Sequence, residues 1–147
     1  TRVDLYLPIS RLAAGAPVPT TAPPREGRGE VVLVVEDEPD VRAIAEGFLK
    51  SLGFAPRAVG NAADALAVLG SDAPVALMFS DVMLGEGLDG FALGRAAREL
   101  RPDLPVLLTS GYNEATAGRG GDAGFELLRK PYRREQLAEA VREIARP

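Results

Sequence analysis

The chain has 147 residues, is 46% hydrophobic and 26% charged, and carries a net charge of -4 at pH 7, which suits one globular domain with its own core. It contains neither cysteine nor histidine, which excludes disulfide bonds, thiolate or imidazole metal sites, cysteine or Ser-His-Asp catalysis, and a phosphohistidine within this chain. The charge argues against nucleic-acid and anionic-membrane partners, and without a spanning apolar run or a signal peptide we expect a cytoplasmic protein.

The first thirty residues are expected to lie outside the main domain. Residues 1–9 alternate between apolar and polar side chains, so they are either a strand left over from an upstream domain or a disordered tail. Residues 10–30 are rich in proline and glycine, which is typical of a linker. Because the chain begins with threonine, we expect it to be a piece of a longer protein, with its last domain at residues 31–147.

That domain is predicted to alternate between buried strands and helices. The strands are expected at residues 31–35, 54–59, 75–81, 106–108 and 125–128, and the helices at 39–52, 61–69, 91–101, 112–124 and around 137–144. Pro56 marks the second strand as an edge strand, and Asn61 is expected to cap the second helix. On the first helix, the residues at helical spacing and so expected to face inward are Val41, Ile44, Ala45, Phe48, Leu49 and Leu52.

Five strand–helix repeats predict an α/β fold, a flavodoxin-like (βα)5 doubly wound parallel sheet. With the second strand at the edge, the strand order would be 2-1-3-4-5. Sheets of this kind bind ligands beyond the carboxyl ends of their strands, where the strand order reverses. In this chain that place lies between the first and third strands.

Polar residues stand at four strand ends around that place. Glu36 and Asp37 follow the first strand, Asp81 ends the third, and Thr109 and Lys130 follow the fourth and fifth runs. Three carboxylates at one place repel each other, and Mg²⁺ or Mn²⁺ would relieve that repulsion. A carboxylate can also act as a nucleophile toward phosphorus, so we predict a phosphoryl-acceptor site with Asp81 as the acceptor and Lys130 and Thr109 on the phosphoryl oxygens.

Taken singly, these residues have ordinary structural explanations. An acidic run favours the N-terminus of a helix, a lone aspartate caps a turn, and a lysine before a helix is often an exposed charge. Their joint placement at four strand ends of one sheet favours the site.

Five segments carry a resemblance to a known family. They read VLVVEDEP at 32–39, SDVML at 80–84, DG at 89–90, LTSGY at 108–112 and RKPY at 129–132. Together they resemble the receiver domain of two-component signalling, the phosphoacceptor module of response regulators and hybrid sensor kinases.

The resemblance implies a role for each matching residue. Asp81 would be phosphorylated, with Glu36 and Asp37 as the acidic pair and Asp37 the more direct Mg²⁺ ligand. The backbone carbonyl of Met83 would complete the protein ligands, and the Lys130–Pro131 peptide bond would be cis.

The resemblance also implies partners. The donor would be a phosphohistidine in a histidine kinase or phosphotransfer domain. Residues 1–8 resemble the last strand of a histidine-kinase ATP-binding domain, which suggests a receiver at the C-terminus of a hybrid kinase.

The chain departs from the family at its output region. Gly85 replaces a frequent proline, and Leu127 replaces the aromatic residue that reports phosphorylation in many receivers, so a ring-flip switch cannot operate there. Residues 112–124, which begin at Tyr112, are rich in glycine. We therefore expect phosphorylation to be read out by ordering of this segment.

Three alternative functions are open to such a sequence. A receiver-like module could act by protein contact without phosphorylation, although the intact acidic residues argue against this. A haloacid-dehalogenase-type phosphatase would need a second aspartate where Met83 stands. A flavodoxin-like flavin protein is disfavoured by the acidic crevice, which repels a phosphate without a metal.

Overall fold

The computed structural model describes residues 27–85, 88–111 and 124–144, and it contains the predicted parallel sheet in the order β2-β1-β3-β4-β5. The strands are β1 (Val31–Val35), β2 (Ala55–Val59), β3 (Val75–Asp81), β4 (Val106–Ser110) and β5 (Glu126–Arg129). The helices are α1 (Pro39–Ser51), α2 (Ala62–Leu69), α3 (Gly90–Leu100) and α5 (Arg134–Ile144). The predicted strand at 1–9, the linker up to residue 26 and the predicted helix at 112–124 lie outside the described residues.

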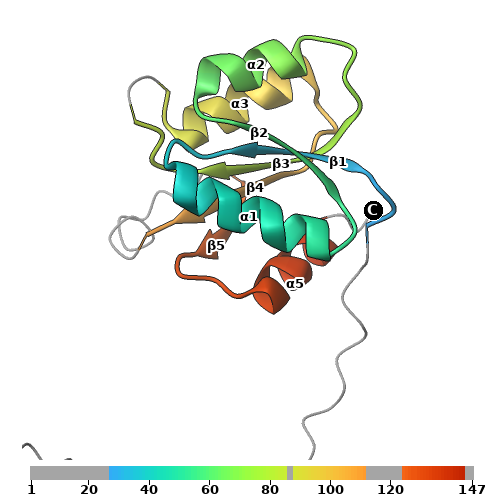
Figure 1. Ribbon diagram of the computed structural model, residues 1–147. Helices are drawn as coiled ribbons and strands as arrows, with labels where there is room; N and C mark the ends of the chain where they lie inside the picture. Colours follow the sequence, from blue (N-terminus) through green and yellow to red (C-terminus); the bar gives the residue numbers. More distant parts are fainter. Residues whose placement is uncertain (1–26, 86–87, 112–123, 145–147) are drawn as a thin grey trace, which may run out of the picture.

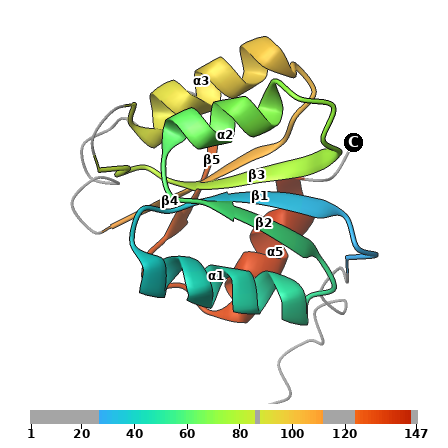
Figure 2. The ribbon, with the colours of Figure 1, turned by 45° about the horizontal axis from the view of Figure 1, so that its top comes forward.

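The helices cover both faces of the sheet, as a doubly wound fold requires. Helices α2 and α3 lie on one face and α1 and α5 on the other, with the strands between them (Figures 1 and 2). Of the four described helices, none is both long enough and apolar enough to pass through a bilayer.

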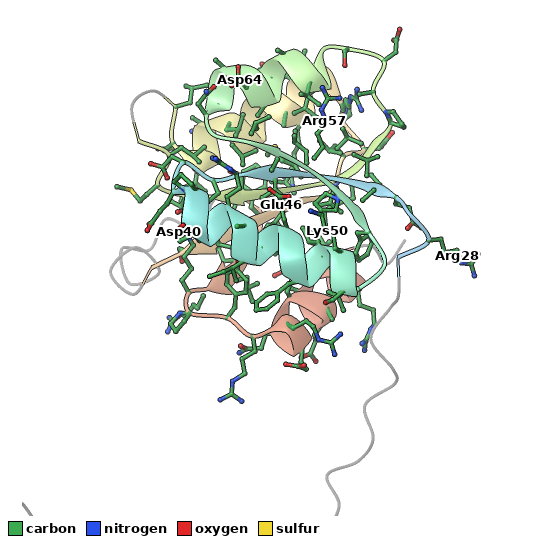
Figure 3. The ribbon with its side chains drawn as sticks, viewed as in Figure 1. Arg28, Asp40, Glu46, Lys50, Arg57 and Asp64 are labelled. Atoms are coloured by element: carbon green, nitrogen blue, oxygen red, sulfur yellow. The ribbon has the colours of Figure 1, made fainter. Side chains whose placement is uncertain are left out.

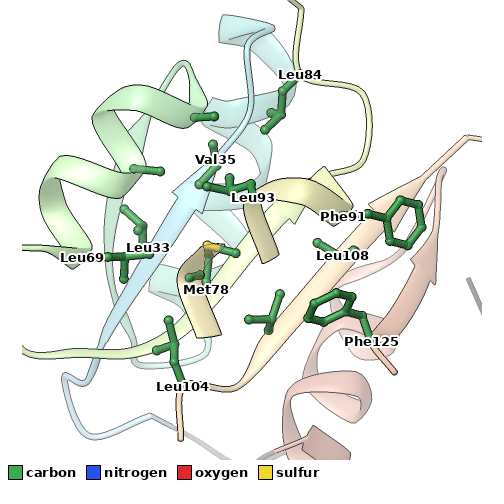
Figure 4. Close-up of a cluster of buried hydrophobic side chains, with 14 of the residues drawn as sticks. Leu33, Val35, Leu69, Met78, Leu84, Phe91, Leu93, Leu104, Leu108 and Phe125 are labelled. Atoms are coloured by element: carbon green, nitrogen blue, oxygen red, sulfur yellow. The ribbon is translucent and has the colours of Figure 1, made fainter. Parts of the chain in front are cut away.

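The domain has two apolar cores, one on each face of the sheet, because successive side chains of a strand point to opposite faces. On the α2/α3 side, Leu33, Met78 and Leu108 pack with Leu93 and the rings of Phe91 and Phe125, as Figure 4 shows. On the α1/α5 side, the alternate residues of the same strands pack with the helices there; this second cluster includes Val32, Val34, Phe79, Leu107, Leu128 and Leu137. Both faces of the central strands are therefore buried, and their carboxyl ends are held rigidly.

Local signals explain where the helices begin and end. The Asn61 side chain accepts a hydrogen bond from the backbone N–H of Asp64 at 2.8 Å, which confirms the predicted cap of α2. Asp89 caps α3 in the same way through the N–H of Ala92. Gly53, at φ 88°, lies in the left-handed region that ends α1.

One prediction about α1 is wrong. Ile44 was expected to face the core, but it is 55% exposed. The buried side of α1 is a narrow stripe centred on Ala45 and Leu49, and Ile44 falls just outside it, because a helix against a sheet buries only part of its circumference.

The folded unit starts earlier than Val31, the predicted start. The N–H of Gly27 donates to the carbonyl of Leu52, and the N–H of Gly29 donates to that of Gly53. These bonds attach the end of the predicted linker to the turn after α1.

Candidate functional site

The register of the parallel strands brings the predicted site residues to one edge of the sheet. Val35 of β1 pairs with Ser80 of β3, so the next residues, Glu36 and Asp81, lie side by side. Asp81 in turn pairs with Thr109 of β4. Beyond β4, the Lys130 N–H donates to the Ser110 carbonyl at 2.8 Å, which brings Lys130 to the same edge.

The two-residue period also gives three of these side chains a common direction. Asp81, Thr109 and Lys130 each stand two residues after a side chain that is buried on the α1/α5 side. Those buried side chains are Phe79, Leu107 and Leu128. The site therefore stands at the carboxyl edge of the sheet above the α1/α5 core.

The three predicted carboxylates meet at this edge. One carboxylate oxygen from each of Glu36, Asp37 and Asp81 lies within 4.8 Å of the others. Glu36 and Asp81 are buried, whereas Asp37 is exposed. An all-oxygen donor set with one side open to solvent fits Mg²⁺ or Mn²⁺, which prefer carboxylates together with water and phosphate oxygens.

Lys130 occupies the centre of this cluster. Its ammonium nitrogen Nζ lies 2.6 Å from Asp81 Oδ2 and 2.8 Å from Glu36 Oε2. A lysine from near the end of the sequence therefore compensates the charge of two of the three carboxylates. Asp37 is the acidic residue of the cluster for which the described structure has no counterion.

The ionisation of the paired groups reflects their burial and each other's charge. Burial raises the pKa of Glu36 and outweighs the hydrogen bond and positive charge of Lys130, which act in the opposite direction. Burial also works against the charge of Lys130, but its hydrogen bonds to Asp81 and Glu36 prevail and raise the pKa of Lys130. Lys130 is therefore a fixed positive charge at neutral pH.

The backbone around Asp81 is held by α3. The N–H of Gly90 donates to the carbonyl of Val82 at 2.8 Å, and the N–H of Val82 donates to the carbonyl of Thr109. A methyl group on Gly90 would lie 2.8 Å from the Val82 Cα and still closer to the carbonyl oxygen of Asp81. The first turn of α3 therefore packs directly on the main chain of Asp81 and Val82, and only glycine permits that approach.

The remaining predicted residues lie outside the cluster of three carboxylates and Lys130. The Thr109 hydroxyl is buried and donates to the carbonyl of Ser80 at 3.5 Å. The N–H of Met83 donates to Asp81 Oδ1 at 3.3 Å, and the role of the Met83 carbonyl stays a prediction. Leu127 is half-buried against the α2/α3 core, and Tyr112 lies outside the described residues.

Two features beside the site were not singled out from the sequence. Arg42 of α1 donates from Nη1 to the carbonyl of Glu36 at 2.8 Å. A groove of about 370 Å³ also opens next to Lys130, and it is lined by Val41, Ile44, Lys130, Pro131 and Tyr132. The peptide bond between two of these lining residues, Lys130 and Pro131, is cis, as predicted.

Tyr132 ties this groove to the α1/α5 core. Its ring makes edge contacts with Phe48 and Phe79, at centroid distances of 6.3 and 5.8 Å. Burial raises the pKa of Tyr132 to about 12, so its hydroxyl stays protonated at neutral pH.

Known proteins resemble this chain in both sequence and fold. The sensor kinase CckA of Brucella abortus (strain 2308) is 36% identical over 118 residues, which cover 77% of this chain and 12% of that protein. The nitrogen assimilation regulatory protein NtrX of Azorhizobium caulinodans is 33% identical over 109 residues, covering 72% and 24%. The crystal structure of a response regulator receiver protein from Sinorhizobium medicae WSM419 has a TM-score of 0.71 at 28% identity, covering 79% of this chain and 94% of that one.

The similarity to these relatives covers one domain of each longer protein. The chain spans about a quarter or less of the length of several curated relatives that it matches. The model of one family, described as the response regulator receiver domain, matches residues 32–142, which is most of the chain. With its five-stranded sheet in the order 2-1-3-4-5, this chain belongs to the response regulator receiver domain family.

Proposed function

We propose that this domain takes a phosphoryl group from a phosphohistidine onto Asp81. The observation that carries the proposal is the convergence of three carboxylates and one lysine, with oxygens within 4.8 Å of one another and Lys130 Nζ 2.6 Å from Asp81. In the transfer, an oxygen of Asp81 bonds to phosphorus as the phosphorus–nitrogen bond of the donor breaks, and the imidazole leaves with the electron pair.

Each residue of the site has a defined task in this proposal. Glu36, Asp37 and Asp81, with the Met83 carbonyl, would hold Mg²⁺ or Mn²⁺, and a bound cation neutralises charge on the phosphoryl oxygens. Lys130 supplies a second fixed positive charge and orients Asp81 through its hydrogen bond. The Thr109 hydroxyl, one strand away from Asp81, would donate to a phosphoryl oxygen.

Replacing Asp81 with asparagine should abolish phosphorylation, because the amide is a far poorer nucleophile than the carboxylate. Intact-mass spectrometry after incubation with acetyl phosphate and Mg²⁺ should detect one added phosphoryl group on the wild type and none on Asp81→Asn. EDTA should suppress the wild-type signal. A wild-type chain that gains no phosphoryl group under these conditions would instead favour a module that acts by contact alone.

The groove beside Lys130 supports a protein as the phosphoryl donor. Exposed Ile44 lines it together with Val41, Pro131 and Tyr132, so most of its lining is apolar. An apolar surface next to a reactive carboxylate can bury a helix or loop of a partner while the partner's histidine reaches Asp81. We propose that the phosphohistidine domain docks here.

Ile44→Glu should therefore slow phosphoryl transfer from a protein donor by about tenfold, the typical effect of losing one contact worth about 1.4 kcal/mol. Uptake from acetyl phosphate should not change, because that small donor needs no docking surface. A histidine kinase fragment that phosphorylates the wild-type chain would serve as donor. The matched control is Leu100→Glu, since Leu100 is 51% exposed but lies on α3, on the other face of the sheet. Equal slowing by both variants would contradict the docking proposal.

The similarity to longer proteins also supports a proposal about the wider setting of this domain. Similarity to a segment of a sensor kinase supports a place in a hybrid kinase, with residues 1–30 as the connection to an upstream domain. Such a domain would act in the cytoplasm, without nucleic-acid contacts of its own.

A further inference from the structure

Asp37 differs from the other two carboxylates in how it is held. Glu36 and Asp81 are fixed by Lys130, but the exposed Asp37 side chain makes no hydrogen bond or ion pair within the described part of the chain. Its position therefore depends on the backbone that carries it. Because Asp37 is the more direct ligand in the proposed metal site, the rigidity of that backbone bears on how well the site is formed before a cation arrives.

Three contacts hold the backbone on and around the peptide that joins Glu36 to Asp37, and one of them is made by that peptide itself. The Glu36 N–H donates to the Val59 carbonyl at 3.2 Å, and the Glu38 N–H donates to Glu36 Oε1 at 3.3 Å. The shortest contact comes from Arg42, whose Nη1 donates to the Glu36 carbonyl at 2.8 Å. That carbonyl belongs to the same rigid peptide plane as the Asp37 nitrogen, so Arg42 determines the direction in which the chain enters Asp37.

Arg42 is itself well placed for this task. It stands in the first turns of α1, and its own N–H donates to the Glu38 carbonyl, so its stem is part of a regular helix. Its guanidinium group also lies against Gly60 after β2, where an added methyl group would come within 3.1 Å of Nη1. The guanidinium therefore fits between the loops after β1 and β2, and the absent side chain of Gly60 leaves room for it.

We propose that Arg42 is a positioning residue for the cation site, holding the Glu36–Asp37 peptide so that the Asp37 carboxylate faces Asp81. The inference rests on the proposed function, since it assigns a role toward the same cation. The positive charge of Arg42 would by itself oppose the binding of a cation nearby, so a role in positioning has the opposite effect on Mg²⁺ affinity.

The direction in which Arg42→Gln changes Mg²⁺ affinity distinguishes a positioning role from a simple charge effect. If Arg42 acted only through its charge, Arg42→Gln would strengthen Mg²⁺ binding, because it removes a positive charge near the carboxylates. If Arg42 positions the peptide, the same variant weakens binding despite the lost repulsion. Arg42→Lys keeps the charge but loses the planar fork that reaches the carbonyl, so it should also weaken binding.

The experiment measures the Mg²⁺ dissociation constant by calorimetry and by backbone amide NMR titration, with unfolding in EDTA recorded for each variant. We expect both Arg42 variants to raise the dissociation constant about tenfold, the lower end of the range for residues that orient metal ligands. Amide shifts in the variants without Mg²⁺ should concentrate at residues 36–38. Arg57→Gln is the charge-matched control, because Arg57 is exposed on β2 and makes no hydrogen bond or ion pair in the described ranges (Figure 3).

Each outcome has a distinct meaning. Arg42→Gln that binds Mg²⁺ as tightly as the wild type, or more tightly, overturns the positioning role. Weaker binding that merely follows a loss of folding in EDTA also overturns it, and Arg42→Lys provides a second variant if Arg42→Gln does not fold. A wild-type chain that binds no Mg²⁺ refutes the proposed cation site itself, and the inference with it, whereas a wild type that binds Mg²⁺ leaves Arg42 as the only point in question.

Discussion

Replacing Lys130 with methionine is expected to slow phosphorylation of Asp81 by about 100-fold, the usual cost of removing one preorganised positive or hydrogen-bonding group from a charged transition state. Methionine keeps much of the length of the side chain but cannot donate to Asp81 Oδ2, which lies 2.6 Å from Nζ in the wild type. The measurement is the initial rate of phosphoryl uptake from acetyl phosphate by intact mass. The neighbouring Arg129 is exposed, so Arg129→Met is the matched control and should change the rate by less than about twofold.

The same substitution should also lower stability, by an amount that depends on Mg²⁺. The side chains of Glu36 and Asp81 are 7% and 10% exposed, so without Lys130 two nearly buried carboxylates lie together uncompensated. Because Lys130 itself is 23% exposed, we expect a loss of about 2 kcal/mol in EDTA, below the 3–5 kcal/mol typical of fully buried pairs.

Mg²⁺ should then stabilise Lys130→Met more than the wild type, because Lys130 no longer competes with the cation for Glu36 and Asp81. A cation that binds only the folded state stabilises that state more, the more tightly it binds. Urea unfolding in EDTA and in Mg²⁺ gives the four free energies of unfolding needed. Equal gains from Mg²⁺ in the two proteins would contradict the view that Lys130 and the cation neutralise the same carboxylates.

Gly90→Ala should destabilise the domain by about 3 kcal/mol, the upper end of the range for overpacking. The added methyl group would meet the main chain of Asp81 and Val82, and backbone atoms cannot turn aside as the end of a flexible side chain can. Relief requires the first turn of α3 to move away from β3, which would also break the hydrogen bond from the Gly90 N–H to the Val82 carbonyl. We therefore expect weaker phosphorylation of Asp81 in this variant as well.

Gly47→Ala is the matched control for this prediction. Gly47 lies in the interior of α1, and an added methyl group there would have no atom within 4 Å. Alanine loses less backbone entropy than glycine on forming a helix, so the variant should gain about 0.5–1 kcal/mol. Urea denaturation followed by circular dichroism gives both values, and a Gly90→Ala variant as stable as the wild type would contradict the contact between α3 and Asp81.

The fold could be predicted from the sequence because its signals are local. Runs of apolar residues such as Val31–Val35 predict buried strands, and Asn61 predicts a helix start, without any knowledge of distant residues. Pro56 predicts an edge strand, and β2 is indeed the first strand in the order of the sheet. The boundaries were less accurate: Ser110 lies within β4 and Arg129 within β5, beyond the predicted strand ends.

The surface of α1 shows where such signals become insufficient. Ile44 shares the apolar spacing of its neighbours, so periodicity alone assigns it to the core. Whether it is buried depends on how far α5 and the turn at Pro131 extend along α1, and neither is local to Ile44. In the structure the side chain lines a groove instead, beside Pro131 and Tyr132.

The sequence by itself determined the chemistry of the site: which carboxylates, which lysine and which strand ends could meet. Parallel pairing carries that information, because each strand delivers its next residue to the same edge. Only the tertiary structure decided how these groups share their charges. Lys130 is 94 positions from Glu36 and 49 from Asp81 in the sequence, yet it contacts both side chains. Gly90 packs against the backbone of Asp81. Both contacts depend on the register of the strands and on how the elements pack. Such contacts leave no periodic trace in a single sequence, because the free energy that selects them arises only when the separate elements are packed together.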